Sequence, residues 1–223
     1  MSQTQDIHAL RGLIRDREAG ASAAPRWLSW LVELRLGAVH EWFESEAPPR
    51  AALAHVTTRA IHARALEQVI WIGREVFPYP LYLDPRVRSA SLFIDAPDPD
   101  ARLWAADLAL RSGARAGVIA DASRFTLACT RRLQLAARSG EGVALLARPR
   151  AEETVLSAAT TRWLVEPARQ SRGVGWMLTL LRNKDNPTLA AERPRWVLHA
   201  GARGDDGVRV HPVVASGTDR ARA

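Results

Sequence analysis

The sequence predicts an α/β protein with a mostly parallel, twisted sheet flanked by helices and antiparallel strands added near the C-terminus. Between residues 37 and 147, short apolar runs alternate with amphipathic stretches of helical length, which is typical of right-handed βαβ crossovers. From residue 161 onward, strand-like runs follow one another across turns, as in antiparallel strands joined to the edge of a parallel sheet. The 223 residues are enough for one domain with a sizeable core.

The first elements expected are helical. Apolar side chains recur at helical spacing over residues 5–18, which predicts a short amphipathic helix. Residues 20–25 are rich in Gly, Ala and Ser and end in proline, as in a linker. A second short helix is expected over residues 27–34.

The strands and helices of the parallel half follow from residue 37. Apolar, often β-branched runs predict the strands, and longer periodic stretches predict the helices. Gly113 lies where a helix C-terminal cap is expected. The expected strands are residues 38–43, 68–72, 91–94, 117–120 and 142–147, and the helices are residues 51–66, 100–112 and 125–138.

The last third is predicted to contain antiparallel strands, with a loop at residues 183–194. They are expected at residues 161–166, 175–181, 196–199 and 208–214, with a turn signal at Asp205-Asp206-Gly207. No repeat or second domain is evident. The predicted organisation is an N-terminal helix and linker at 1–24, a core domain at 25–215 and a disordered polar tail at 216–223.

Composition excludes several classes of protein. Apolar residues make up 47% and charged residues 25%, as in soluble globular proteins. The longest apolar runs fall far short of the ~20 residues that span a bilayer, and the N-terminus lacks an apolar signal core. Cys129 is the single cysteine, so neither an internal disulfide nor a cysteine-based zinc site is possible. We expect a cytoplasmic protein without membrane contact.

The basic charge has an unusual make-up. Thirty-one basic and 24 acidic residues give a net charge of +7, and Lys184 is the single lysine. Codon bias in a GC-rich genome explains so much arginine and alanine, and is the preferred explanation. A phosphate-binding surface is the alternative, because a net positive field attracts nucleic acid.

A strand, a turn and a helix over residues 37–54 form the setting of a phosphate-binding P-loop, whose pattern is G-x-x-x-x-G-K-[ST]. Aligned by spacing, its four defining positions hold Glu44, Pro49, Arg50 and Ala51. Proline supplies no N–H to an anion nest, glutamate adds negative charge, and alanine has no hydroxyl for Mg²⁺. Arg50 keeps a positive charge but cannot restore the cradle. We expect no nucleotide cofactor here.

Four segments resemble, in order and spacing, the ATPase core of RecA recombinases over roughly residues 28–200. They are GAVHEWF, VIWIGREV, DLALRSGARAGVIADASRFT and WMLTLLRNKDNP. The resemblance implies a RecA-like fold. It matches Asp121 to the aspartate that ends the Walker B strand and Glu75 to the family's catalytic glutamate. Arg182 and Lys184 match two lysines that reach the neighbouring subunit's nucleotide in RecA.

A closer resemblance is to the ImuA-type family, RecA-like accessory proteins of damage-induced mutagenesis. The stretches that carry it are LGAVHEWF, RLWAADLALRSGA, TRRLQLAARSGEGVALL and AATTRWLVEPA. This resemblance implies a protein that binds partners: RecA, a catalytically degenerate Y-family-like protein called ImuB, and an alternative replicative-type polymerase. The RecA contact would use the interface that RecA uses with itself, where Arg182 and Lys184 would lie.

Each candidate residue also has a structural explanation. Asp121 and Glu75 at strand ends are typical of turn and helix caps, which we favour over a vestigial catalytic role. Arg131 and Arg138 share one face of a helix, as a solvated surface or as a contact for an acidic partner. Arg169 and Arg172 lie in a loop between strands where DNA contact is an option, although no aromatic accompanies them.

The tryptophans favour core packing. Trp71, Trp104 and Trp176 lie in core-like patterns, while Trp27, Trp30 and Trp42 are candidates for a partner groove, with core packing preferred. The six histidines show no metal-ligand spacing, and no hydrolase motif is present.

The leading hypothesis is a non-catalytic RecA-like adaptor, a pseudo-ATPase, in SOS translesion DNA synthesis and DNA repair. It would bind RecA, an ImuB-like partner, or both. The alternatives are a SulA-like inhibitor of cell division, a salt-dependent DNA-binding RecA paralogue, and an ATPase with a remodelled loop. A division inhibitor would block polymerisation of the tubulin-like division protein, and an adaptor would not.

Overall fold

A computed structural model describes residues 36–44, 50–62, 66–79, 83–168, 174–200 and 209–212. The chain divides into the units 1–33 and 34–223, and every described residue belongs to the second. The expected helices at 5–18 and 27–34, the domain boundary at 24/25 and the tail at 216–223 lie outside the described residues and stay predictions.

The described strands form a nine-stranded sheet in the order β3-β2-β4-β5-β1-β6-β7-β8-β9. The strands are β1 (Ala38–Glu44), β2 (Gln68–Ile72), β3 (Ser91–Ile94), β4 (Ala116–Asp121), β5 (Val143–Pro149), β6 (Thr161–Ala168), β7 (Val174–Asn183), β8 (Arg195–Ala200) and β9 (Arg209–Pro212). The helices are α3 (Arg50–His62), η2 (Arg74–Val76), α4 (Pro85–Ser89), α5 (Pro99–Arg111), α6 (Leu127–Gly140), η4 (Arg150–Glu152) and α7 (Pro187–Ala191).

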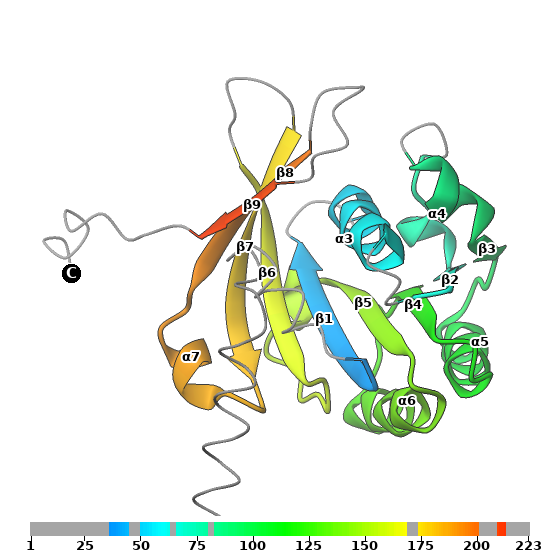
Figure 1. Cartoon of the computed structure of the whole chain (residues 1–223). Coiled ribbons are helices and arrows are strands. Elements are labelled where there is room, and N and C mark those ends of the chain that lie inside the picture. Colours follow the sequence, from blue (N-terminus) through cyan, green and yellow to red (C-terminus); the bar gives the residue numbers. More distant parts are fainter. Residues whose placement is uncertain are drawn as a thin grey trace, which may run out of the picture. The chain divides into compact units, whose positions relative to one another are not determined.

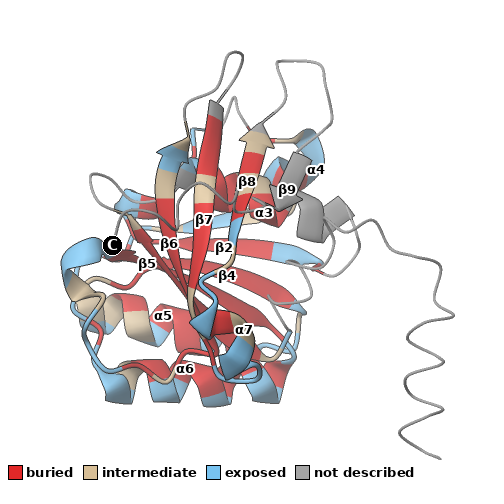
Figure 2. Cartoon of the chain, turned by 90° about the vertical axis from the view of Figure 1, so that its left-hand side faces the viewer, coloured by how far each residue is buried: buried red, intermediate tan, exposed pale blue. Residues whose placement is uncertain are grey.

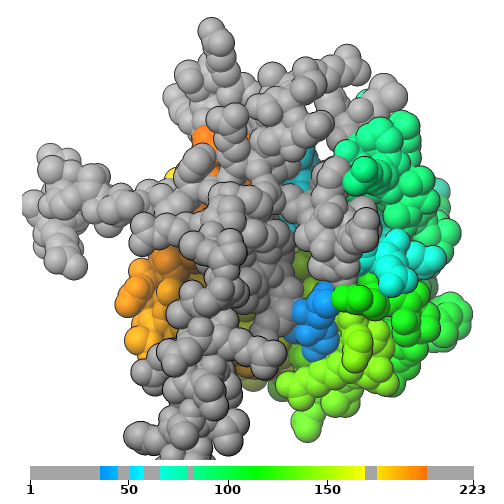
Figure 3. All heavy atoms as spheres, viewed as in Figure 1, coloured from blue at the N-terminus to red at the C-terminus, as the bar shows by residue number. Residues whose placement is uncertain are grey.

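Strand pairing confirms the predicted fold class. The first six strands of that order pair in parallel, and β6 to β9 pair antiparallel. Strand β6 therefore joins the two halves, because it runs parallel to β1 on one side and antiparallel to β7 on the other. Helices α5 and α6 cover one face of the parallel half, while α3 and α4 lie on the other face (Figure 1). In the space-filling view, α4 and α5 (green) and α7 (orange) lie on opposite sides (Figure 3).

The core under α5 and α6 shows why these segments are helical. Leu110 on α5 and Leu133 on α6 are buried against strands β1, β2, β4 and β5, and both helices are exposed on their outer sides (Figure 2). Gly140 ends α6 beside α5, where an added Cβ would lie 1.8 Å from the carbonyl oxygen of Leu110. This close approach lets the two helices pack side by side.

The tryptophans separate into buried and exposed sites. Trp42 and Trp71 are completely buried and Trp176 nearly so, which confirms core packing for them. The prediction for Trp104 is wrong: its side chain is 62% exposed. Its position on α5 places it four residues before the exposed Leu108, on the outer face of the helix.

Candidate functional site

The carboxyl ends of β1, β2 and β4 meet at one edge of the sheet, where open α/β folds bind ligands. Glu44 ends β1 and is half-buried, and α3 begins at Arg50. Pro49, with residues 45–48, lies outside the described residues, as does the side chain of Arg50. Ala51, in the first turn of α3, is exposed.

Asp121, at the end of β4, is buried and fully engaged by its neighbours. Nη1 of Arg102, from α5, donates to its Oδ2 at 2.5 Å, and both side chains are about nine-tenths buried. The backbone N–H of Ser123 donates to its Oδ1 at 2.9 Å, which confirms that this aspartate caps the turn after its strand. Both carboxylate oxygens are therefore occupied by donors from the chain itself.

Gly73 makes room for this ion pair. It follows β2 with a φ of +87°, a conformation that glycine adopts without strain. An added Cβ would lie 2.9 Å from Cδ of Arg102 and 3.2 Å from Cβ of Asp121. The end of β2 can lie against the ion pair only because residue 73 has no side chain.

A further acidic residue of this edge, Glu75, lies outside the buried pair. Glu75 is exposed on the short helix η2 after β2. Beside it, Arg74 is bound to Asp95 at the end of β3, at 2.5 Å, and that pair is exposed. Among the described residues, no group of three or more His, Cys, Asp or Glu could hold a metal ion.

The structure places Arg182 and Lys184 near the end of β7, facing backbone carbonyls. Arg182 Nη1 donates to the carbonyl oxygen of Ser157 at 3.2 Å, and Lys184 Nζ donates to that of Ala158 at 2.5 Å. Burial, together with Arg182 and Arg138, lowers the pKa of Lys184 below its ordinary value. The two cations are thus neighbours, as their spacing predicts, and both hold the loop before β6.

Arg131 and Arg138 are exposed on α6, in agreement with the predicted shared face. Arg132, which follows Arg131, connects α6 to α5: its Nη2 lies 3.0 Å from Oδ2 of Asp107. Arg169 and Arg172 lie outside the described residues.

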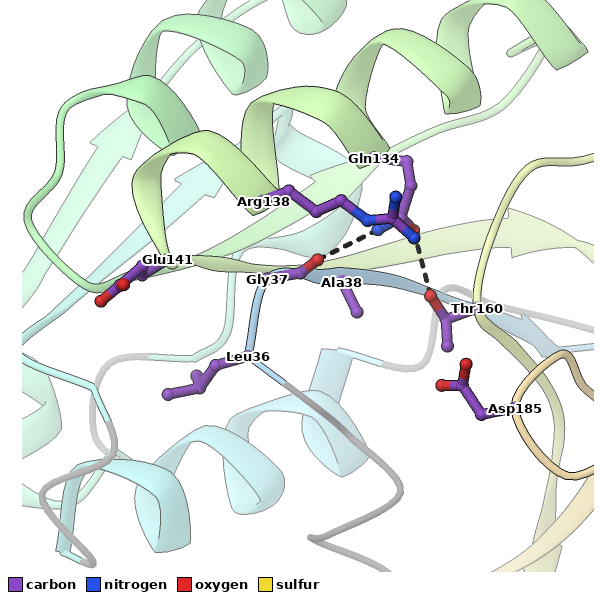
Figure 4. A pocket seen from close by; sticks show the side chains of 8 residues that line it. All are labelled: Leu36, Gly37, Ala38, Gln134, Arg138, Glu141, Thr160 and Asp185. Carbon is purple, nitrogen blue, oxygen red and sulfur yellow. Dashed lines mark hydrogen bonds between the residues drawn. The ribbon is translucent and has the colours of Figure 1, made fainter. Parts of the chain in front are cut away.

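Arg138 also lines a cavity of about 530 Å³ at the amino end of β1. This end is at the opposite edge of the sheet from Asp121, which lies at the carboxyl end of β4. Three of its lining residues are joined by hydrogen bonds. Thr160 Oγ1 donates to Gln134 Oε1, and Gln134 Nε2 donates to the carbonyl oxygen of Gly37, each at 3.0 Å. Arg138 lies beside Gln134, and Asp185 lies below Thr160 (Figure 4). The lining residues are Leu36, Gly37, Ala38, Gln134, Arg138, Glu141, Thr160 and Asp185.

Sequence reasoning missed a buried charge network within the sheet. Glu41 on β1 is completely buried and accepts hydrogen bonds at 2.7 Å from Arg148 on β5 and at 2.7 Å from Arg162 on β6. Ser157 Oγ donates to it at 2.8 Å, and the Arg162 guanidinium lies 4.7 Å from the ring centre of Phe43. A glutamate in the middle of an apolar strand was the signal, but its partners come from distant segments.

No family model and no curated protein matches this sequence. Among solved structures, the chain is similar to a RadB recombinase, with a TM-score of 0.57 and 14% identity over 80% of this chain and 95% of the recombinase chain. That similarity shows that the fold is RecA-like. None of the described helices is long and apolar enough to cross a membrane.

Proposed function

We propose that this protein is a RecA-like adaptor without ATPase activity, which binds RecA, an ImuB-like protein, or both, in damage-induced translesion DNA synthesis. The observation that carries the proposal is the buried ion pair between Arg102 and Asp121. In the RecA resemblance, Asp121 matches the aspartate that ends the Walker B strand. Here a guanidinium and a backbone N–H occupy both its oxygens. A metal-bound nucleotide would have to displace Arg102 into a buried site without a partner, which is costly.

The sequence at the P-loop positions also supports the proposed lack of ATPase activity. The four P-loop positions hold Glu44, Pro49, Arg50 and Ala51, which lack the glycines, the lysine and the hydroxyl that a phosphate cradle uses. The resemblance to the ImuA-type family supplies the partners. A RecA-like fold without a working nucleotide site retains its surfaces, and the proposal assigns the function to those surfaces.

Thermal unfolding with and without Mg-ATP tests the loss of the nucleotide site. A protein that binds ligand present at a hundred times its dissociation constant gains about 2.7 kcal/mol of stability. We expect no shift in the melting temperature of this protein, with RecA as the positive control in the same buffer. A reproducible, saturable shift would contradict the pseudo-ATPase proposal.

Binding to the proposed partners is the second test. We expect the purified protein to bind RecA or the ImuB-like protein in a light-scattering titration, with the same affinity in the absence and presence of Mg-ATP. Absence of binding to both would remove the adaptor function and leave the RecA-like fold unaffected.

Direct DNA binding is a second candidate, favoured by the net charge of +7 and the exposed arginines of α6. Phosphate contacts release counterions, so the affinity for a duplex or single strand would fall steeply as salt increases. A fluorescence anisotropy titration at two salt concentrations separates this candidate from the adaptor, whose protein contacts depend less on salt.

A further inference from the structure

Lys184 is the single lysine among the 31 basic residues of the chain, and it directly follows β7 at an exposed position. An arginine would supply the same charge and a hydrogen bond to the same carbonyl, so charge alone does not require a lysine here. A lysine differs because its amine can lose a proton and then act as a nucleophile, whereas an arginine stays protonated. The surroundings of the amine determine whether this chemistry is available.

Hydrogen bonds hold the amine of Lys184 in a fixed place. The backbone N–H of Lys184 donates to the carbonyl oxygen of Thr160 at 2.9 Å, and its Nζ donates to that of Ala158 at 2.5 Å. Asn183, immediately before it, is buried, and its Oδ1 accepts from the backbone N–H of Asp185 at 2.9 Å. A neutral amine that donates one N–H to a carbonyl keeps its lone pair free. The nucleophilic electron pair of Lys184 is therefore available at the surface.

Cations also surround this amine. Burial and the guanidiniums of Arg182 and Arg138 lower the pKa of Lys184 below its ordinary value. The carboxylates of Glu41 and Asp185 act in the opposite direction, and the net change is a decrease. The neutral form of this amine is thus more populated than that of an ordinary surface lysine at the same pH.

The cavity of about 530 Å³ adjoins Lys184, and this volume is typical of a small-molecule site. Thr160, which accepts from the backbone of Lys184, and Asp185, the next residue, both line it. Arg138 lines it too, and its guanidinium makes no ion pair with a carboxylate of the described residues. Figure 4 shows this guanidinium on the same side of the cavity as Thr160, with the carboxylate of Glu141 on the far side. A planar guanidinium in this state is suited to bind a phosphate group through two hydrogen bonds.

We propose that Lys184 is an acylation site for small acyl phosphates, whose phosphate group is bound by Arg138 in the cavity and whose acyl carbon lies toward the amine. The neutral amine attacks the acyl carbon, so that a C–N bond forms and the bond from this carbon to the phosphate oxygen breaks. The electron pair of the broken bond leaves on the phosphate, which also takes up the proton that the amine releases. The products are an Nζ-acyl lysine and inorganic phosphate.

The leaving group distinguishes acyl phosphates from other acyl donors. A departing phosphate carries negative charge that the guanidinium of Arg138 stabilises. An ester or thioester whose leaving group has no phosphate gains nothing from this arginine. Acylation would remove the positive charge of Lys184 beside Arg182. The inference concerns this site alone and does not depend on the proposed adaptor function.

Acetyl phosphate is the probe, and mass spectrometry of an arginine-specific digest separates acetylation of Lys184 from that of the terminal α-amino group. The reference is a peptide of residues 180–188 with blocked ends, which keeps the neighbours in sequence but lacks the fold. We expect Lys184 in the folded protein to react about tenfold faster than in the peptide, or more, at the same pH. The rate should saturate with acetyl phosphate and fall when inorganic phosphate is added.

Two variants separate phosphate binding from simple reactivity of the amine. Arg138→Gln should slow acetylation by acetyl phosphate about tenfold. It should change acetylation by p-nitrophenyl acetate, which has no phosphate, by less than about threefold. Arg131→Gln is the matched control, because Arg131 is exposed on the same helix but does not line the cavity, and it should react like wild type. All three proteins should melt at the same temperature.

Several results would overturn the proposal. Equal rates in protein and peptide, or acetylation of the α-amino group alone, would show that Lys184 is an ordinary surface lysine. A fast reaction that ignores inorganic phosphate and is unchanged in Arg138→Gln would show a reactive amine without a phosphate site. Equal slowing of both reagents in Arg138→Gln would mean that this arginine acts on the amine and binds no phosphate. None of these outcomes bears on binding to RecA or the ImuB-like protein.

Discussion

Two buried carboxylates of this protein are both bound by arginine, yet they serve different parts of the fold. Asp121 lies at the carboxyl edge of the sheet and has one arginine partner, Arg102. Glu41 lies in the middle of β1 and has two arginine partners, from the strands on either side. In the resemblance to RecA, the aspartate of the first pair matches the one that ends the Walker B strand. The second supports the loop between β5 and β6, which exposes Leu156.

The comparison shows that burial of a charge pair says little about purpose until its surroundings are known. Around Asp121, every contact ends within the edge itself, at Ser123 and Gly73. Around Glu41, the arginines continue outward to Glu152, Glu153 and Val155 and so connect the sheet to the surface. The first cluster stays at its own edge of the sheet, and the second fixes a loop at the surface.

The largest effect is expected for Glu41→Ala. Removing this carboxylate leaves Arg148 and Arg162 buried without their shared partner, and breaking a buried pair in this way costs about 3–5 kcal/mol. Urea unfolding measures the loss. Glu166→Ala is the control, because the Arg150–Glu166 pair is exposed and is worth less than about 1 kcal/mol. Equal losses in the two variants would show that the network has no special role in the fold.

A smaller loss is expected at Asp121, where one arginine instead of two is left unpaired. Asp121→Leu and Arg102→Met should each destabilise the protein by about 3 kcal/mol, and the double variant by less than their sum. A double-mutant cycle from urea unfolding gives the coupling energy. Additive losses would mean that the two side chains act independently. The proposal that their ion pair excludes a metal-bound nucleotide would then lose its energetic basis.

The sequence predicted the architecture well because the signals were local. Apolar runs marked each parallel strand, and the predicted strand at 117–120 is found as Ala116–Asp121. Helix α4 was missed although its signal was present: Asp84 caps it and Pro85 opens it. For Trp104, helical spacing fitted a core position, but only packing against the sheet decides which side of α5 is outward.

The candidate site was less predictable because it depends on strand order. Glu41 lies 107 positions from Arg148 and 121 positions from Arg162, and they meet only because β1 lies between β5 and β6. The partner of Asp121 was hidden for a different reason: Arg102 lies on α5, and the sequence does not show which side chains of this helix reach the end of β4. A single sequence shows that these residues are charged within apolar segments, but not which charges meet.

The smallest effect is expected at the exposed end of the Glu41 region. Lys184→Met removes one hydrogen bond to the carbonyl of Ala158 at a site open to water, so its cost at neutral pH should stay below about 1 kcal/mol.

The pH dependence of stability tests the role of Lys184 more sharply. Burial and neighbouring arginines lower the pKa of Lys184, so between the lowered pKa and the ordinary one the folded protein releases this proton while the unfolded chain still holds it. Stability from this group therefore rises with pH between the lowered pKa and the ordinary value of 10.5. Urea unfolding of wild type and variant at pH 8 and pH 10.5 should show a wild-type gain that Lys184→Met lacks. The same pH dependence in both proteins would mean that Lys184 is solvated like an ordinary surface lysine, and that the buried arginines alone hold the loop.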